Sequence, residues 1–295
     1  MKHLTHRLVL AVIAAMIGML FTPVRADAVW WWPSGPNCGA NIAKPTGGNW
    51  RCTFADEFNG SSLDTSKWVV QQTASSGFHS GSECFVSSSN NVRVSAGALS
   101  LTARRESAPF SCKSPYGAYT TQVTSGSVST WGKFAQAYGR FEIRAKFPAS
   151  TIAGLHSALW MYPQKLTYGA WPTSGEIDIA EEYSQYPDRA IPYVHYATAT
   201  NDSTVTNTRC MISDVSAFHT YVAEWTTTGI TISYDGVPCV THKWNPAAPL
   251  TGSKPFDQPF IVWLTQALGN NTNAYSATTT QLPATTQVDY VHVWS

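Results

Sequence analysis

The sequence predicts an all-β fold, a sandwich or jelly roll built from two sheets. Segments in which apolar and polar residues alternate with a period of two recur along the chain, and turn residues bound them. Segments with the 3.6-residue period of an amphipathic helix are nearly absent. With 295 residues, the chain is long enough to bury a sizeable core.

The clearest strand is "YGRFEIRAKF", in which Phe141, Ile143 and Ala145 alternate with polar residues. The same alternation predicts strands in "TVTNTRCMI" (204–212), "TYVAEW" (220–225), "ITISYDGVPCVTH" (230–242) and "TQVDYVHVW" (286–294). Within the third of these, Asp235-Gly236 predicts a hairpin turn. Residues 51–295 contain no linker, repeat or long run of charge, so we expect one domain there.

The N-terminus predicts export. Residues 1–28 combine a basic start, an apolar run and small residues at Ala26 and Ala28, which are the three parts of a cleaved secretory signal. A membrane anchor is the alternative, which the shortness of the run and Pro23 disfavour. Residues 29–50 are rich in Gly, Pro and Trp and predict an irregular leader. We therefore expect a secreted protein with no membrane partner once the signal is removed. We also expect a monomer.

Composition narrows the kind of ligand. Only 13% of the residues are charged, the net charge is +1, and Lys and Arg form no runs, which argues against a nucleic-acid partner. Twelve Trp residues among many Ser, Thr, Gly and Asn are typical of a β protein that handles neutral, hydroxylated ligands.

All six cysteines follow the signal, so we expect disulfides. The simplest pairing joins sequence neighbours, namely Cys38 with Cys52, Cys84 with Cys112, and Cys210 with Cys239. A structural zinc site is the alternative, but the sequence has no CxxC motif and its histidines lie far from the cysteines.

The stretch "SGEIDIAEEY", residues 174–183, concentrates four acids: Glu176, Asp178, Glu181 and Glu182. On a regular strand, Glu176, Asp178 and Glu182 share a face, whereas one bulged residue after Asp178 places Glu181 on that face instead. Carboxylates at this density repel one another, which favours a functional role. A solvated acidic edge or a calcium site is the alternative.

Distance distinguishes the two arrangements. A retaining glycosidase needs two carboxyl groups about 5 Å apart, one as nucleophile and one as general acid and base. Strand positions four apart lie about 13 Å apart at Cα, which two leaning Glu side chains can bridge. A bulge gives Glu176 and Glu181 that effective spacing, whereas Glu176 and Glu182 on a straight strand lie about 20 Å apart. The spacing therefore favours the bulge.

Eight blocks in order give the chain its family resemblance. These are "FADEFNG" with "LDTSKW", "NNVRVSAGALSLTA", "YGRFEIRAKFP", "GLHSALWMYP", "WPTSGEIDIAE", "FHTYVAEW", "YDGVP" and "VDYVHVW". From about Thr53 to Trp294 the chain resembles glycoside hydrolase family 16, in its β-bulge, laminarinase-like branch. The resemblance implies a β-jelly-roll of two antiparallel sheets with a concave cleft for a β-glucan. It also implies that Glu176 is the nucleophile, Asp178 an assisting acid and Glu181 the acid/base.

The resemblance further implies substrate-binding residues. Trp171 matches a Trp that lines the cleft beside the cleaved bond, and Trp160 is a second candidate for stacking on a sugar. Glu142 and Arg144 match residues that point into the cleft, although a solvated outer face is the alternative. His195 resembles a polar residue of the cleft floor, or else is a structural histidine.

A calcium site and two departures complete the comparison with the family pattern. Glu57, the carbonyl of Gly97 and Asp289 match the ligands of one structural Ca²⁺, whereas catalysis is expected to need no cofactor. Thr265 stands in "LTQALGN" where relatives have a cleft Asn, and Ala180 stands where bulged relatives commonly have Met. These departures affect the sugar-binding subsites, so the family pattern alone does not identify the polysaccharide substrate.

The sequence thus predicts a secreted retaining endo-β-glucanase that cleaves internal bonds of a β-glucan by double displacement. A laminarin-like β-1,3-glucan is the expected substrate. The alternatives are a non-hydrolytic β-glucan-binding lectin on the same fold and a cell-wall transglycosylase.

Overall fold

The computed structural model describes residues 35–39 and 41–295. The predicted signal, residues 1–28, and the first part of the predicted leader lie outside the described residues. In the described part of the leader, the one β-bridge joins Ala43 to Asn49. None of the described helices is long and apolar enough to cross a membrane.

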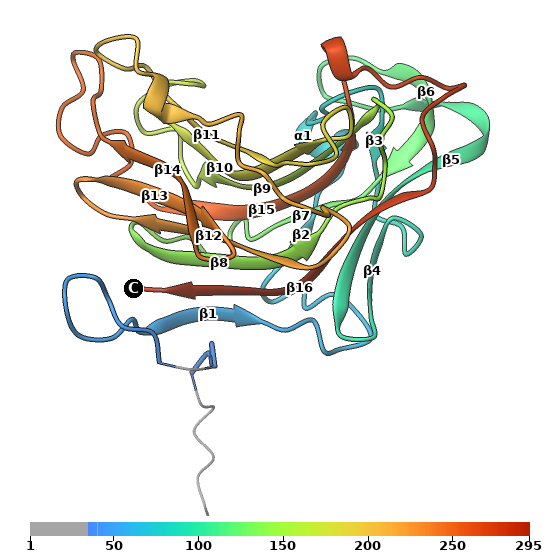
Figure 1. Ribbon diagram of the computed structural model, residues 1–295. Helices are drawn as coiled ribbons and strands as arrows, with labels where there is room; N and C mark the ends of the chain where they lie inside the picture. Colours follow the sequence, from blue (N-terminus) through green and yellow to red (C-terminus); the bar gives the residue numbers. More distant parts are fainter. Residues whose placement is uncertain (1–34, 40) are drawn as a thin grey trace, which may run out of the picture. The chain divides into compact units, whose positions relative to one another are not determined.

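Two sheets make up the fold (Figure 1). The larger has ten strands in the order β14-β13-β12-β8-β16-β5-β6-β3, with β1 paired to β16 and β4 paired to β5. Its strands are β1 (Cys52–Asp56), β3 (Cys84–Phe85), β4 (Val92–Ser95), β5 (Ala98–Cys112), β6 (Tyr119–Ser125), β8 (Gly139–Lys146), β12 (His219–Trp225), β13 (Gly229–Tyr234), β14 (Val237–Lys243) and β16 (Ala284–Trp294).

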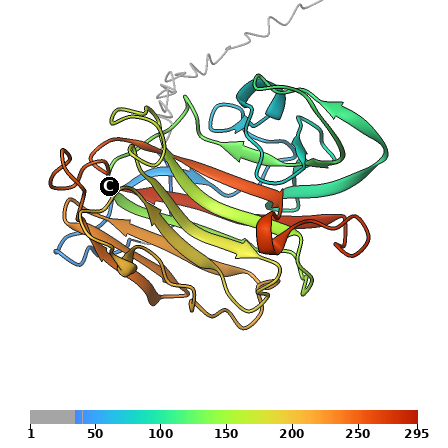
Figure 2. The same ribbon diagram turned by 90° about the horizontal axis from the view of Figure 1, so that it is seen from above.

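The smaller sheet has six strands in the order β11-β10-β9-β15-β7-β2, and Figure 2 looks down onto it. Its strands are β2 (Val69–Val70), β7 (Ser127–Ser129), β9 (Leu155–Pro163), β10 (Glu176–Tyr183), β11 (Ile191–His195) and β15 (Phe260–Leu268). The described helical elements are short: α1 (Thr73–Ser76), η1 (Ser203–Val205) and η2 (Asn271–Asn273). The predicted all-β, two-sheet fold is therefore confirmed. Strand pairing is antiparallel except between β3 and β6.

The hydrophobic core lies between the two sheets. Phe141 and Ile143 of β8 belong to the same buried cluster as Ile177 and Ile179 of β10. Because side chains alternate across a strand, the residues between these positions point away from the core. Each sheet therefore has an outward face of its own, and these two faces lie on opposite sides of the sandwich.

The Asp235-Gly236 turn is confirmed. Strands β13 and β14 pair antiparallel on either side of it. Both turn residues have positive φ, 49° at Asp235 and 79° at Gly236, as a two-residue type I′ hairpin requires.

The strand predicted over "TVTNTRCMI" is wrong. The segment begins in the short helix η1, and only isolated bridges follow, at Thr206 and Met211. Its polar side chains bond to backbone groups: Thr206 donates to the carbonyl of Pro192 and Asn207 to that of Cys239. Such bonds replace the ladder that a strand would form.

The three sequence-neighbour disulfides are confirmed: Cys38–Cys52, Cys84–Cys112 and Cys210–Cys239. The first joins the described part of the leader to β1, which itself pairs with the last strand, β16. The second joins β3 to the end of β5, and so fixes the segment between α1 and β3.

We predict that the double substitution Cys84→Ala/Cys112→Ala lowers the free energy of unfolding by about 3 to 4 kcal/mol, because the lost bridge closes a loop of 28 residues. Urea denaturation of wild type and variant measures the difference. Cys38→Ala/Cys52→Ala, which opens a loop of 14 residues, is the matched control and should lose less stability. Equal stability of wild type and the 84/112 variant would contradict the prediction.

Candidate active site

Strand β10 contains the predicted bulge. Along the neighbouring β9, Asp178 lies opposite Trp160 and Glu181 lies opposite Ala158, with a register shift between Asp178 and Ala180. Trp160 and Ala158 are two apart and share a face, so Asp178 and Glu181 also share a face. The bulge thus brings Glu176, Asp178 and Glu181 to the outward face of the six-stranded sheet. Glu182, opposite Ser157, points the other way.

Glu176, Asp178 and His195 form a compact cluster. One polar atom from each lies within 4.8 Å of those of the other two, and His195 of β11 pairs across the sheet with Glu176. His195 Nε2 lies 3.0 Å from Asp178 Oδ2. Glu176 and Asp178 lie close enough for each to perturb the pKa of the other, and the nearby Trp171 side chain favours the ionised form of Glu176. The structure therefore places the predicted cleft-floor histidine beside the acids.

Burial makes the Glu176–Asp178 pair retain protons. It raises the pKa of Glu176 to about 9, with a further contribution from the charge of Asp178. Burial and the charge of Glu181 raise the pKa of Asp178 well above its ordinary value. Burial also lowers the pKa of His195, which favours the neutral imidazole. At neutral pH, the pair therefore holds at least one proton.

Glu181 is in the opposite electrostatic situation. Burial raises its pKa, but hydrogen bonds from His156 and Tyr183, together with the electrostatic effect of the neighbouring imidazoles, outweigh this effect and leave the pKa below the ordinary value. His156 Nε2 lies 2.9 Å from Glu181 Oε1, and the Tyr183 hydroxyl donates to the same oxygen over 2.8 Å. Three acids on one face thus differ in their proton affinities, which is the arrangement that acid–base catalysis requires.

The two predicted stacking tryptophans differ in exposure. Trp171 is 54% exposed and lies beside His195, with ring centroids 5.7 Å apart. Trp160 is only 7% exposed, stacks on Trp263 at 4.6 Å and contacts Phe78 at 5.6 Å. A sugar therefore has access to the ring of Trp171, whereas the stacking prediction for Trp160 is wrong because other aromatic rings cover it.

Thr265, the departure noted in the sequence, lies beneath Trp160. Its hydroxyl accepts a hydrogen bond from the Trp160 indole at 3.1 Å and lies 3.0 Å from Ser127 Oγ. Thr265 is buried, so it supports the aromatic layer from below.

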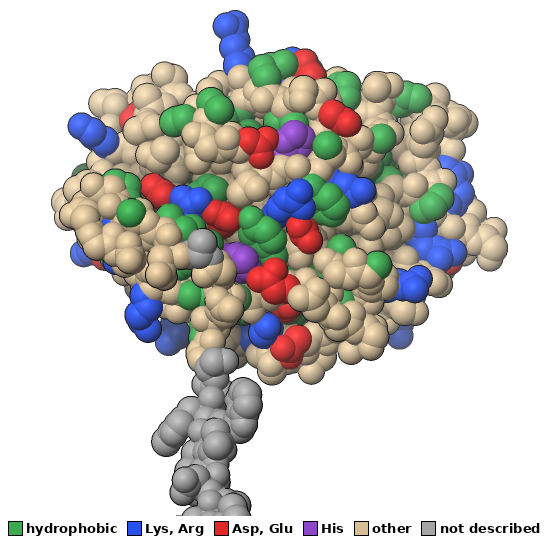
Figure 3. Space-filling model, turned by 60° about the horizontal axis from the view of Figure 1, so that its bottom comes forward, with side chains coloured by type: hydrophobic (Ala, Val, Ile, Leu, Met, Phe, Trp, Pro, Cys, Tyr) green, Lys and Arg blue, Asp and Glu red, His purple; other side chains and the backbone are tan. Residues whose placement is uncertain are grey.

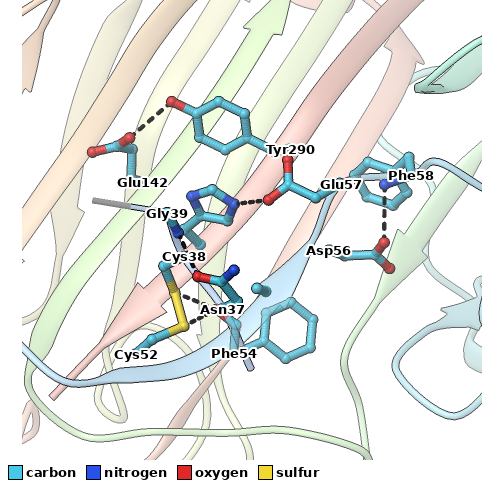
Figure 4. Close-up of polar contacts among 12 residues, drawn as sticks. Asn37, Cys38, Gly39, Cys52, Phe54, Asp56, Glu57, Phe58, Glu142 and Tyr290 are labelled. Carbon is cyan, nitrogen blue, oxygen red and sulfur yellow. Dashed lines mark hydrogen bonds and ion pairs between the residues drawn. A yellow bond between two sulfur atoms is a disulfide. The ribbon is translucent and has the colours of Figure 1, made fainter. Parts of the chain in front are cut away.

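Glu142 and Arg144 do not point into the cleft, contrary to the prediction. They lie on β8 of the ten-stranded sheet and alternate with core residues, so they face the outside of that sheet, on the other side of the core from Glu176. Glu142 accepts a hydrogen bond from Tyr290 (Figure 4) and another from Arg140, and Arg144 pairs with Asp289. The period of two identified an outward face, but it could not specify which sheet carried that face.

The residues predicted to bind calcium are engaged by other groups. Glu57 pairs with His292 (Figure 4), and Asp289 pairs with the Arg144 guanidinium. Gly97 has positive φ and lies near the side chain of Asn59. Cationic or hydrogen-bonding groups thus pair with both carboxylates, and calcium binding by Glu57, Gly97 and Asp289 stays a prediction. On this side of the molecule, acidic and basic side chains are interspersed (Figure 3).

Glu182 is buried in the core behind the acids. Its side chain has no exposed surface, and Ser157 Oγ lies 3.4 Å from its Oε2. Its Oε1 has no hydrogen-bond partner among the described residues. Burial raises its pKa to about 8, so the folded protein holds Glu182 protonated near neutral pH.

Sequence reasoning missed His156, Tyr183 and Ser80. His156 and Tyr183 could have been found from the sequence. His156 lies an even number of positions from Trp160, and Tyr183 an even number from Glu181, so the members of each pair share a strand face. Ser80 had no such sequence signal, since it reaches the site from the distant segment between α1 and β3, with Oγ 2.9 Å from His156 Nδ1.

A cavity of about 180 Å³, lined by Trp171, His195, Asn201 and Asp202 among others, lies next to the cluster of Glu176, Asp178 and His195.

Comparisons with known proteins agree with this geometry. The model of the family described as Glycosyl hydrolases family 16 matches residues 78–291. The chain is 32% identical to the "Beta-glucanase" of Rhodothermus marinus over 83% of its own length and 85% of the relative's. It is 31% identical to "Glucan endo-1,3-beta-glucosidase A1" of Niallia circulans over 82% of its own length, but spans only 37% of that longer protein. The solved structure of the laminarinase from Rhodothermus marinus superposes with a TM-score of 0.68 at 30% identity, covering 83% of this chain and 97% of that one.

We predict that Glu182→Gln changes how stability depends on pH. An acid whose folded-state pKa is raised to about 8 from 4.5 destabilises the fold progressively as pH rises through that interval, because unfolding then releases a proton. The Gln variant lacks this loss. The stability of Glu182→Gln relative to wild type should therefore grow between pH 4.5 and 8 and level off above that range.

Urea denaturation at a series of pH values measures this difference. A stability difference between Glu182→Gln and wild type that is constant across the whole pH series would contradict the buried, protonated state of Glu182.

Proposed function

The chain belongs to glycosyl hydrolase family 16, and from that premise we propose that it is an exported endo-β-glucanase that hydrolyses β-1,3-glucan with retention at the anomeric carbon. The observation that carries the proposal is the bulge in β10, which gathers Glu176, Asp178 and Glu181 on one face. The three disulfides support export, because such bonds persist in oxidising compartments.

Glu176 is the proposed nucleophile. It must be ionised to attack the anomeric carbon, and the Glu176–Asp178 pair retains a proton. We assign that proton to Asp178, which is the more deeply buried of the two. Asp178 then donates a hydrogen bond to Glu176 and leaves it ionised. When Glu176 attacks the anomeric carbon it loses its negative charge, and the hydrogen bond from Asp178 weakens. The protonation state of Asp178 can then adjust to the new charge of Glu176.

Glu181 is the proposed acid and base. The lowered pKa of Glu181 makes its protonated form a minority near neutral pH, and it is this form that gives a proton to the glycosidic oxygen in the first step, so that the departing chain leaves as an alcohol. In the second step the same carboxylate takes a proton from water, which attacks the glycosyl–enzyme bond and releases Glu176.

Trp171 is the proposed sugar platform. Its indole is exposed beside His195 and lies close enough to Glu176 to favour the ionised form of that carboxyl, so a sugar stacked on it lies next to the nucleophile. The names of the relatives favour a β-1,3-glucan: one is a glucan endo-1,3-beta-glucosidase, and one matching structure is a laminarinase.

Incubation with laminarin, lichenan, agarose and carrageenan tests the function. We expect reducing ends to appear fastest from laminarin, first as a mixture of oligomers, as endo cleavage requires. Proton NMR during the first minutes should show the β-anomer before mutarotation. Binding to laminarin without any product from the four polymers would support the lectin instead, and transfer products in place of hydrolysis would support the transglycosylase.

The catalytic assignments are tested by three amide substitutions on the same strand. Glu176→Gln should remove nearly all activity on laminarin, and Glu181→Gln should lower kcat by about 10²- to 10⁴-fold. Glu182→Gln is the matched control and should keep most of the activity, because its side chain faces the core. An inactive Glu182→Gln beside an active Glu181→Gln would overturn the assignment.

The corrected position of Arg144 gives a separate prediction. Arg144→Ala should leave kcat/KM on laminarin within about twofold of wild type, because the residue lies across the core from the acids and its half-exposed ion pair contributes little to stability. A large rise in KM would place this side chain in contact with the substrate after all.

A further inference from the structure

The two oxygens of Glu181 are held differently. Oε1 accepts hydrogen bonds from two side chains, His156 at 2.9 Å and Tyr183 at 2.8 Å. Oε2 makes no hydrogen bond to any residue that the structure describes. The Glu181 side chain is 14% exposed, so solvent or a substrate can reach it from the outward face.

His156 is itself fixed. Its Nδ1 lies 2.9 Å from the Ser80 hydroxyl, and its ring stacks on that of Tyr183 with centroids 4.6 Å apart and planes 9° apart. A hydroxyl that donates to Nδ1 leaves the hydrogen of the neutral imidazole on Nε2, which is the atom facing Glu181. We take the Ser80 hydroxyl as the donor to Nδ1, and in this arrangement Ser80 selects the tautomer that donates to the carboxyl.

Ser80 is in turn held by a buried acid. The Glu83 carboxyl accepts hydrogen bonds from the backbone N–H groups of Ser80, Gly81 and Leu268, at 2.7, 3.0 and 3.0 Å. The Asn270 side chain donates to the Ser80 carbonyl at 2.9 Å. These bonds tie the segment between α1 and β3 to the end of β15, so Ser80 has a defined place beside the site.

We propose that His156, oriented by Ser80, and Tyr183 are positioning residues that occupy Oε1 of Glu181 and thereby direct its catalytic proton to Oε2. The inference rests on the proposed role of Glu181 as acid and base. With Oε1 accepting two hydrogen bonds, the neutral carboxyl carries its hydrogen on the other oxygen, which faces the substrate.

The proton steps follow from this arrangement. The hydrogen on Oε2 passes to the glycosidic oxygen as the bond from that oxygen to the anomeric carbon breaks, and the electron pair of the bond stays on the oxygen. The resulting carboxylate keeps both donors at Oε1. In the second step, Oε2 removes a proton from the water that attacks the glycosyl–enzyme.

The same donors should make Glu181 a stronger acid, because hydrogen bonds to a carboxylate favour its ionised form. Several other titratable groups also face Glu181 or act on it: Glu176 and Asp178 on β10, His195 on β11 and Tyr234 on β13. Tyr234 donates to the carbonyl of Ile179, so it is not a donor to Glu181. Removal of a donor at Oε1 should therefore let Glu181 keep its proton to higher pH.

The test compares pH profiles of kcat/KM on laminarin. His156→Phe keeps a ring against Tyr183 but loses the donor, and Tyr183→Phe loses only the hydroxyl. In both variants, the alkaline limb should move upward by about one pH unit, since a hydrogen bond to a charged group is of that size. Ser80→Ala should move it in the same direction by less, and His156→Gln, whose amide N–H can still donate, should stay nearer to wild type.

His219→Gln is the matched control, because His219 forms a comparable pair with Asp235 on the ten-stranded sheet, 2.6 Å between Nδ1 and Oδ2. Its profile should match that of wild type. If His156→Phe and Tyr183→Phe lose activity equally at all pH values with no movement of the alkaline limb, their role is structural and the proposal is overturned.

A second measurement does not depend on turnover. Carbon-13 NMR titration of labelled glutamate carboxyls, with Glu181→Gln to assign the resonance, reports the pKa of Glu181 directly. This pKa should rise in His156→Phe and Tyr183→Phe, and an unchanged pKa in both would overturn the proposal even in an active enzyme. Failure of the wild-type protein to hydrolyse any glucan would instead refute the proposed function, and the titration would still decide whether the two donors act on Glu181.

Discussion

The candidate site depends on one extra residue in strand β10. Without the register shift between Asp178 and Ala180, Glu181 would point into the core and Glu182 would join the outward row. The bulge thus exchanges the surroundings of two adjacent glutamates. Glu181 obtains two hydrogen-bond donors and access from outside, whereas Glu182 is enclosed between the sheets with one weak partner.

The same strand therefore holds carboxyl groups in different protonation states. Burial and mutual repulsion favour protons on the Glu176–Asp178 pair, and donors from β9 and β10 favour the charged form of Glu181. Three ionised acids at this spacing would repel strongly. A shared proton removes part of that repulsion, so the arrangement that suits acid–base chemistry also reduces the cost of placing the acids together.

The sequence predicted features that depend on neighbours along the chain. Parity and the distance limit on a carboxyl pair were sufficient to predict the bulge, and Asp235-Gly236 was sufficient for its hairpin. Glu142 and Arg144 were misplaced because alternation shows that a residue leaves the core but does not identify the side of the sandwich. The strand expected at 204–212 failed because Thr and Asn side chains there bond to backbone groups of other segments. Ser80 acts across 76 positions of sequence, which no local pattern records.

Exposure separates the aromatic residues of the site into two groups. Trp160, Trp263 and Phe78 pack on one another, and Thr265 and Ser127 accept the indole N–H groups of the two tryptophans. Such a layer is rigid because both its ring faces and its polar atoms are occupied. Trp171 has the reverse character, with an open ring that lies close to Glu176. The layer can therefore fix the shape of the face, whereas Trp171 remains free to contact a sugar next to the acid that would attack it.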